Sequence, residues 1–230
     1  MKPVFCPWQP ACVRRNQPIK SVNFDTMNAH YPLRERRKRQ TRMALIDAAL
    51  DLFSEKGYED TTLEQIADHA GLHVQTLYRH FPSKPHLATA ADQDRLDEFT
   101  AAIQNPDRTT TTFEFWREWI QLSVQRLREQ TEGLDRYRQL IRRTGELPTV
   151  STRIVMISYK YERLLTESFA ADFHLDPDED RLPRLVACML WGANAEVARR
   201  YALEGDFDFI EEALAVANAV DELFGHYVKR

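Results

Sequence analysis

The apolar residues of this chain recur at the spacing of an α-helix over most of its length. In the first clear example, four of them stand at positions i, i+3, i+4 and i+7: Ile46, Ala49, Leu50 and Phe53. This spacing predicts a helix over about residues 37–56, closed by Gly57. No segment alternates with the period of two that marks a half-buried strand. The pattern therefore predicts an all-α fold.

Two shorter helices are expected next, separated by a glycine. Thr62 and Gln65 have the spacing of a capping box, so a helix of about two turns begins after Thr62. Gly71 stands where a residue that ends a helix adopts a left-handed conformation. A second short helix follows over 74–80, with two expected core residues: Leu77 and Phe81. This arrangement is typical of a helix-turn-helix, in which the second helix reads DNA.

The remainder of the chain is again helical in pattern. A fourth helix is expected to reach Gln104, and the others are predicted near 113–130, 134–143, 149–172, 177–204 and 208–228. Four of these helices have capping residues at their start: Ser83, Thr111 with Glu114, Asp176 with Pro177, and Asp208. The sequence predicts a small N-terminal three-helix domain followed by a larger helical bundle.

Charge is distributed unevenly along the chain, although the net charge is only -4. Through residue 90 there are 13 Lys and Arg against 9 Asp and Glu, a net of +4, and the remainder has 18 against 26, a net of -8. Six of the cations lie between Arg34 and Arg42. A basic arm of this kind favours DNA by releasing counterions from its backbone, and a merely solvated run of charge is the alternative.

Several other classes of protein are disfavoured by the sequence. No apolar run is long enough to span a membrane, and the first 30 residues do not resemble an export signal, so we expect a cytoplasmic protein. Cys6 and Cys12 lack a second pair of metal ligands and are interpreted as incidental thiols. A calcium loop beginning at Asp176 is rejected, because Arg181 replaces its glycine and Ala187 its bidentate glutamate. With no phosphate loop and no catalytic pair, we expect neither an enzyme nor a cofactor or metal site.

Around the helix-turn-helix, many residue types fall in a characteristic order without a gap: Thr41-Arg42, Ile46, Ala48, Ala49, Leu52, Phe53, Gly57-Tyr58, Thr62, Ile66, Ala67, Ala70-Gly71, Leu77-Tyr78, His80-Phe81, Lys84 and Leu87. This stretch, roughly residues 38 to 95, resembles the DNA-binding domain of TetR-family transcriptional regulators. The family usually has Ser or Thr where this chain has His73, so the role of His73 is open.

The resemblance implies three segments with different roles. Residues 1–32 are proline-rich and are expected to be a disordered extension. Residues 33–95 are expected to form the DNA-binding domain. Residues 96–230 are expected to bind an effector and to form a homodimer, because one short recognition helix makes too few base contacts for tight binding. In the last two helices, two apolar stripes are candidates for the dimer interface or for the core of a single chain: Leu182, Leu185, Val186, Met189 and Ala193, and Ile210, Ala213, Leu214, Ala217 and Phe224.

Base recognition is expected from the exposed N-terminal half of the second motif helix: His73, Val74, Gln75, Thr76 and Arg79. Gln75 suits adenine, Arg79 suits guanine or phosphate, and the methyl groups of Val74 or Thr76 suit thymine. The resemblance implies phosphate contacts from a further set: Thr41, Arg42, Thr62, Tyr78, His80 and Lys84. The alternative for Tyr78 and His80 is that they cover the small core.

The C-terminal half is rich in aromatic residues, which suits an apolar effector pocket as well as a plain bundle core. The candidate pocket residues are Trp116, Trp119, Tyr137, Tyr159, Met189 and Asn194. The expected function is a regulator, usually a repressor in this family, that releases a palindromic operator when a small, largely apolar molecule binds. The alternative is a DNA-binding regulator without an effector, controlled by a protein partner or constitutive.

Overall fold

The computed structural model describes residues 33–129, 138, 142, 148–205 and 207–229. The predicted disordered extension, Tyr137 and nearly all of the helix expected over 134–143 lie outside these residues. The backbone divides into two units, Met1–Gln40 and Thr41–Arg230. Of the first unit, residues 33–40 are described, and they form the exposed beginning of α1.

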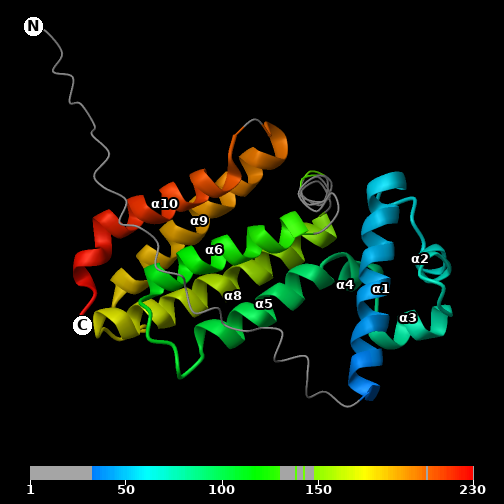
Figure 1. Cartoon of the computed structure of the whole chain (residues 1–230), viewed down its shortest axis with the longest axis horizontal. Helices are drawn as coiled ribbons and strands as arrows, with labels where there is room; N and C mark the ends of the chain where they lie inside the picture. Colours follow the sequence, from blue (N-terminus) through cyan, green and yellow to red (C-terminus); the bar gives the residue numbers. More distant parts are fainter. Residues whose placement is uncertain (1–32, 130–137, 139–141, 143–147, 206, 230) are drawn as a thin grey trace, which may run out of the picture. The chain divides into compact units, whose positions relative to one another are not determined.

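The described residues contain helices and no strand, which confirms the all-α prediction (Figure 1). The helices are α1 Leu33–Lys56, α2 Leu63–His69, α3 Val74–His80, α4 Lys84–Ala88, α5 Ala90–Ile103, α6 Thr112–Glu129, α8 Pro148–Phe173, α9 Arg181–Leu203 and α10 Phe209–Phe224, followed by the 3₁₀ turn η2 Gly225–Tyr227. Helix α1 begins four residues before its predicted start, because residues 33–36 contain strong helix formers.

The start of α2 and the turn after it have the predicted geometry. Thr62 Oγ1 accepts a hydrogen bond from the Gln65 backbone N–H at 3.2 Å, and Gln65 Oε1 accepts one from the Thr62 backbone N–H at 3.0 Å. Gly71 has a φ of +66°, which glycine adopts without the steric penalty of a Cβ atom. The capping box and the glycine turn together set the path of the chain into α3.

Two hydrophobic cores lie within Thr41–Arg230. The first joins helices α1 to α4, with Leu45, Ile66 and Leu77 fully buried, and it includes Val150 of α8, which is also 0 % exposed. The second fills the bundle of α5, α6, α8, α9 and α10, in which α6, α8, α9 and α10 lie side by side (Figure 1). Leu77 and Phe81 are 0 % and 2 % exposed, so their assignment to the first core is confirmed.

The single helix expected from Ser83 to Gln104 is wrong, because the helix breaks at Thr89. The backbone of Thr89 has φ -105° and ψ 10°, outside the α-helical region, and its hydroxyl donates to the Pro85 carbonyl oxygen at 3.0 Å. Such a bond to the carbonyl four residues earlier often bends a helix, and here it accompanies the break between α4 and α5. Ser83 makes no capping bond; its hydroxyl contacts His86 Nδ1 at 2.8 Å instead.

The predicted start of α9 at residue 177 is also wrong. Asp176 Oδ1 accepts from the backbone N–H groups of Asp178 and Glu179, at 2.8 and 3.2 Å, and so closes a turn rather than capping a helix. Helix α9 begins only at Arg181. The other predicted caps are confirmed: Asp208 accepts from two N–H groups at the start of α10, and Thr111 pairs with Glu114 before α6.

Candidate functional site

One face of α3 presents polar side chains to solvent. His73, Gln75, Tyr78 and Arg79 are exposed, whereas Val74 and Thr76 are half-buried. Tyr78 is 50 % exposed, so part of its side chain is open to solvent. The buried Leu77 anchors the helix, and the exposed residues around it provide an amide, a guanidinium, a phenol and an imidazole. These are groups that hydrogen-bond base edges and phosphates.

His73 occupies the N-cap position of α3 but does not cap it with its side chain. Its backbone is extended, with φ -71° and ψ 141°, and its carbonyl oxygen accepts from the Thr76 N–H at 2.8 Å. No capping hydrogen bond is made by the imidazole, which is exposed. His73 therefore directs its side chain to solvent at the start of α3.

Arg42 is half-buried and is engaged by other residues of the chain. Its guanidinium binds the Asp94 carboxylate of α5 with two nitrogens, Nη2 to Oδ1 at 2.7 Å and Nε to Oδ2 at 3.2 Å. It also lies 4.7 Å from the centre of the Phe81 ring. Because Asp94 competes with any phosphate for this group, the structure uses Arg42 to tie α1 to α5. Sequence reasoning missed Asp94, since no local pattern links residues this far apart.

Lys84 is similarly engaged. Its Nζ donates to the Glu59 carbonyl oxygen at 3.3 Å and lies 4.3 Å from the centre of the Tyr58 ring. Burial lowers the pKa of Lys84, and the nearby carboxylates of Glu59 and Asp60 oppose that shift. Three further candidates for phosphate contacts remain. Thr62 is exposed, and Thr41 and His80 are half-buried.

A polar joint connects the start of α8 to α4 and α5. Arg153 Nε donates to the Thr89 hydroxyl at 3.0 Å, and its Nη1 donates to His86 Nε2 at 3.2 Å. With Nε2 accepting, the imidazole proton resides on Nδ1 and points to the Ser83 hydroxyl, 2.8 Å away. We call these residues the α8 joint: Ser83, His86, Thr89 and Arg153. Together with the buried Val150, they give α8 direct contact with the helix-turn-helix core.

The candidate pocket residues are only partly brought together. Trp116 and Trp119 are 3 % and 7 % exposed, and both contact Phe99 edge to face, at centroid distances of 5.9 and 5.1 Å. Tyr159 and Met189 lie on the surface, 58 % and 43 % exposed. The last two candidates are Asn194, which is half-buried and donates to the Leu190 carbonyl oxygen, and Tyr137, which lies outside the described residues.

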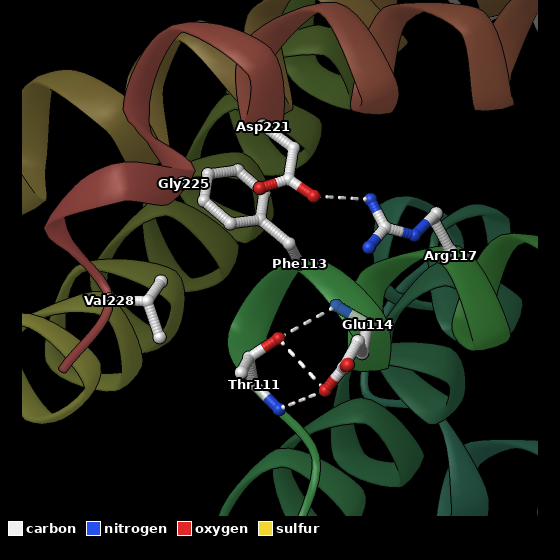
Figure 2. Close-up of a pocket in the computed structure, with 7 residues that line it drawn as sticks. All are labelled: Thr111, Phe113, Glu114, Arg117, Asp221, Gly225 and Val228. Carbon is white, nitrogen blue, oxygen red and sulfur yellow. Dashed lines mark hydrogen bonds and ion pairs between the residues drawn. The ribbon is translucent and has the colours of Figure 1, made fainter. Parts of the chain in front are cut away.

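A groove of about 340 Å³ lies between the start of α6 and the end of α10 (Figure 2). Its residues are Thr111, Phe113, Glu114, Arg117, Asp221, Gly225 and Val228. Figure 2 shows that its polar groups already pair with each other: Arg117 binds Asp221 at 2.9 Å, and Glu114 accepts from Thr111. This lining does not match the apolar effector pocket that the sequence predicted.

Two further observations concern membrane spans and metal sites. Within the described ranges, no helix is long and apolar enough to cross a membrane. The same residues contain no cluster of histidine, cysteine and carboxylate side chains that suits a metal ion.

Comparison with known proteins identifies the relatives of this chain. Residues 45–91 match the model for bacterial regulatory proteins of the tetR family. The chain is also 30 % identical over 194 residues to the transcriptional regulator TcmR of Streptomyces glaucescens, covering 83 % of this chain and 86 % of TcmR. The chain belongs to the TetR family. As a member of this family, it is a DNA-binding transcriptional regulator.

Other TetR-family proteins match parts of the chain. The transcriptional repressor KstR of Mycobacterium tuberculosis is 47 % identical over 58 residues, or 25 % of this chain and 24 % of KstR. The structure of the SmeT–triclosan complex superposes with a TM-score of 0.64 at 21 % identity, covering 83 % of this chain and 92 % of SmeT. The structural match supports the fold of both the N-terminal domain and the bundle.

Proposed function

We propose that this TetR-family regulator is a cytoplasmic homodimeric repressor, which releases a palindromic operator when a small, largely apolar molecule binds its helical bundle. The exposed polar face of α3 is the observation that carries the proposal. His73, Gln75 and Arg79 surround a fully buried anchor, Leu77, so the helix is fixed while its reading groups face solvent. The name of one relative, the repressor KstR, supports repression.

The residues of the interface divide into two groups in this proposal. Gln75 and Arg79 read base edges, and His73 reaches a base or phosphate from the start of α3. Tyr78 and Thr62, both exposed, bind phosphates and set the register. Arg42 and Lys84 act mainly by holding the domain together, since both are engaged within the chain. The basic segment that precedes Thr41 adds attraction that does not depend on sequence.

Dimerisation is proposed through the exposed faces of α9 and α10. On α9, Leu185, Met189 and Gly192 follow one another at i, i+4 and i+7, and all are exposed. On α10, an exposed row stands at i, i+4 and i+8: Ala215, Ala219 and Leu223. The two helices pack against each other, so the rows belong to adjoining elements. Small residues beside larger apolar ones allow the close approach that a four-helix dimer interface needs.

Effector control is proposed to pass through α8. The helix contributes Tyr161 to the aromatic core of the bundle and Arg153 to the α8 joint. A molecule that binds beside the aromatic core therefore acts on an element that also contacts α4 and α5. A change in the position of α8 alters the spacing of the two recognition helices in the dimer and shifts the population away from DNA. The triclosan complex of SmeT supports an effector that binds the protein directly.

The test is a gel-shift titration on selected operator DNA and on random DNA of the same length. Arg79→Ala is expected to weaken specific binding by ~1–3 kcal/mol and to leave binding to random DNA nearly unchanged. Arg163→Ala, which removes an exposed arginine of the bundle, is the matched control. Equal losses on both DNAs would reassign Arg79 to phosphate contact. Operator binding that no apolar compound reverses would favour control by a protein partner instead.

A further inference from the structure

Arg42 of α1 lies beside the end of α3, the helix that is proposed to read DNA. Its guanidinium is 4.7 Å from the centre of the Phe81 ring, and Phe81 is the C-cap of α3. Tyr78 and Arg79, in the last turn of α3, are exposed. A phosphate that meets this end of α3 therefore comes close to Arg42. The charge and the planar N–H donors of a guanidinium suit phosphate oxygens.

Asp94 of α5 engages this guanidinium in the way that a phosphate would. Its two carboxylate oxygens accept from two nitrogens of Arg42, Nη2 at 2.7 Å and Nε at 3.2 Å. Arginine binds carboxylates and phosphates with the same two-pronged geometry, so the two anions compete for one group. The side chains of Arg42 and Asp94 are 29 % and 34 % exposed. Water and salt screen a pair with this exposure, so a phosphate is able to compete with Asp94.

We infer that Asp94 is an internal competitor of the DNA phosphates for Arg42, and that it lowers the affinity of this regulator for DNA of any sequence. The inference rests on the proposed DNA interface around α3 and names a residue outside that interface that regulates it. While Arg42 is paired with Asp94, it releases fewer counterions from the DNA backbone than a free guanidinium does. Because phosphate contacts carry no sequence information, operator and random DNA are affected alike.

The test measures how binding of the full-length protein to a selected operator and to a random duplex depends on salt, between about 50 and 200 mM. Asp94→Asn keeps the shape of the side chain and removes its charge. On both DNAs it is expected to steepen the slope of log K against log salt by up to about 0.9 per subunit, the value for one further phosphate contact. Its gain in affinity over the wild-type protein should be up to roughly three- to fourfold larger per subunit at the lower salt concentration.

The matched control is Asp97→Asn, which removes an exposed carboxylate one turn further along α5. It changes the net charge by the same amount and is expected to keep the slope of the wild-type protein. Asp94→Ser removes the same charge as Asp94→Asn and should steepen the slope equally, so the test does not depend on one variant folding. Thermal unfolding followed by circular dichroism checks that each protein is folded.

Arg42→Ala separates an exchange of partners from a general loss of negative charge. Added to Asp94→Asn, it is expected to return the slope to that of the wild-type protein. Alone, with Asp94 in place, it should change the slope far less. The inference is overturned by a slope that Asp94→Asn leaves unchanged, by equal steepening in Asp97→Asn, or by steepening that persists after Arg42→Ala is added. A loss of the full increment in Arg42→Ala alone would also overturn it, because Arg42 would then already bind a phosphate.

The same titrations separate this inference from the proposed function. If an operator is preferred and Gln75 and Arg79 read it, but the slope does not respond to Asp94→Asn, the proposed interface stands and the role of Asp94 fails. If no sequence is preferred while Asp94→Asn steepens the slope on random DNA, the competition stands and the proposed reading of an operator fails.

Discussion

Gly71 sets the geometry of the turn between α2 and α3. Its φ of +66° places it in the left-handed region, and a Cβ atom built there would meet no atom within 4 Å. Glycine is therefore favoured at position 71 by the backbone conformation alone and not by crowding from neighbouring atoms. This is why glycine could be recognised from the sequence, as could the cap formed by Thr62 and Gln65. Both signals depend on residues within one turn of each other.

Gly71→Ala is expected to lower the free energy of unfolding by ~1–2 kcal/mol, because an L-residue is strained in the left-handed region. Gly71→Asn should cost less, since asparagine tolerates this conformation. Thermal or urea unfolding of the three proteins measures the difference. Equal stability of the alanine and wild-type proteins would show that the turn relaxes to a negative φ.

Contacts between residues far apart in the chain could not be predicted from the sequence. Arg42 was expected at a phosphate because the family resemblance implied it, and this stays a prediction. The structure adds an ion pair with Asp94, which the sequence did not indicate. His73 shows the opposite case: the sequence left its role open, and the structure shows an exposed imidazole that does not cap α3. Local chemistry indicates which residues are unusual, and tertiary packing decides which of them are available to a ligand.

At the scale of elements, the break between α4 and α5 departs from the continuous helix that the sequence predicted. The predicted continuous helix would have placed Thr89 inside a regular ladder. Thr89, at the break, accepts a hydrogen bond from Arg153, and Val150 of α8 lies in the first core. The sequence predicted the elements from their periodicity, but the contacts of Arg153 with Thr89 and His86 join residues more than 60 positions apart. Periodicity carries no information about such contacts.

Arg153→Ala is expected to weaken the response to an effector by roughly 2- to 30-fold, because it removes two of the hydrogen bonds that link α8 to α4 and α5. Effector-free binding to the operator should change less. The measurement is an operator titration with and without an effector that releases the wild-type protein. Arg163→Ala, on the same helix and far more exposed, serves as the control. An unchanged effector response in Arg153→Ala would remove the α8 joint from the proposed route.

At the scale of the whole molecule, the proposed dimer would present two recognition helices and so raise the affinity for DNA. The apolar stripe predicted on α9 divides in the structure: Val186 is 0 % exposed in the bundle core, whereas Leu185 and Met189 are largely exposed. The sequence alone left the core and the interface as competing explanations for one stripe. Burial separates them, because residues one position apart on a helix point in directions about a quarter-turn apart.

Met189→Arg is expected to shift the protein towards the monomer, since two charges related by the two-fold axis would be buried without partners. Operator affinity should fall with it. Leu122→Arg alters an exposed leucine of α6, away from the proposed interface, and should leave the dimer intact. Analytical ultracentrifugation gives the dissociation constant for each protein. A dimer of unchanged stability in Met189→Arg would place the interface elsewhere.

Selection of bound sequences from a random pool of duplex DNA is the most direct test of DNA reading by a dimer through α3. The account predicts an enriched palindrome whose two half-sites are about one helical turn apart, and Gln75→Ala or Arg79→Ala should relax the preference at defined positions in each half. Enrichment of no sequence, or a motif that is unchanged when both residues are replaced, would contradict it.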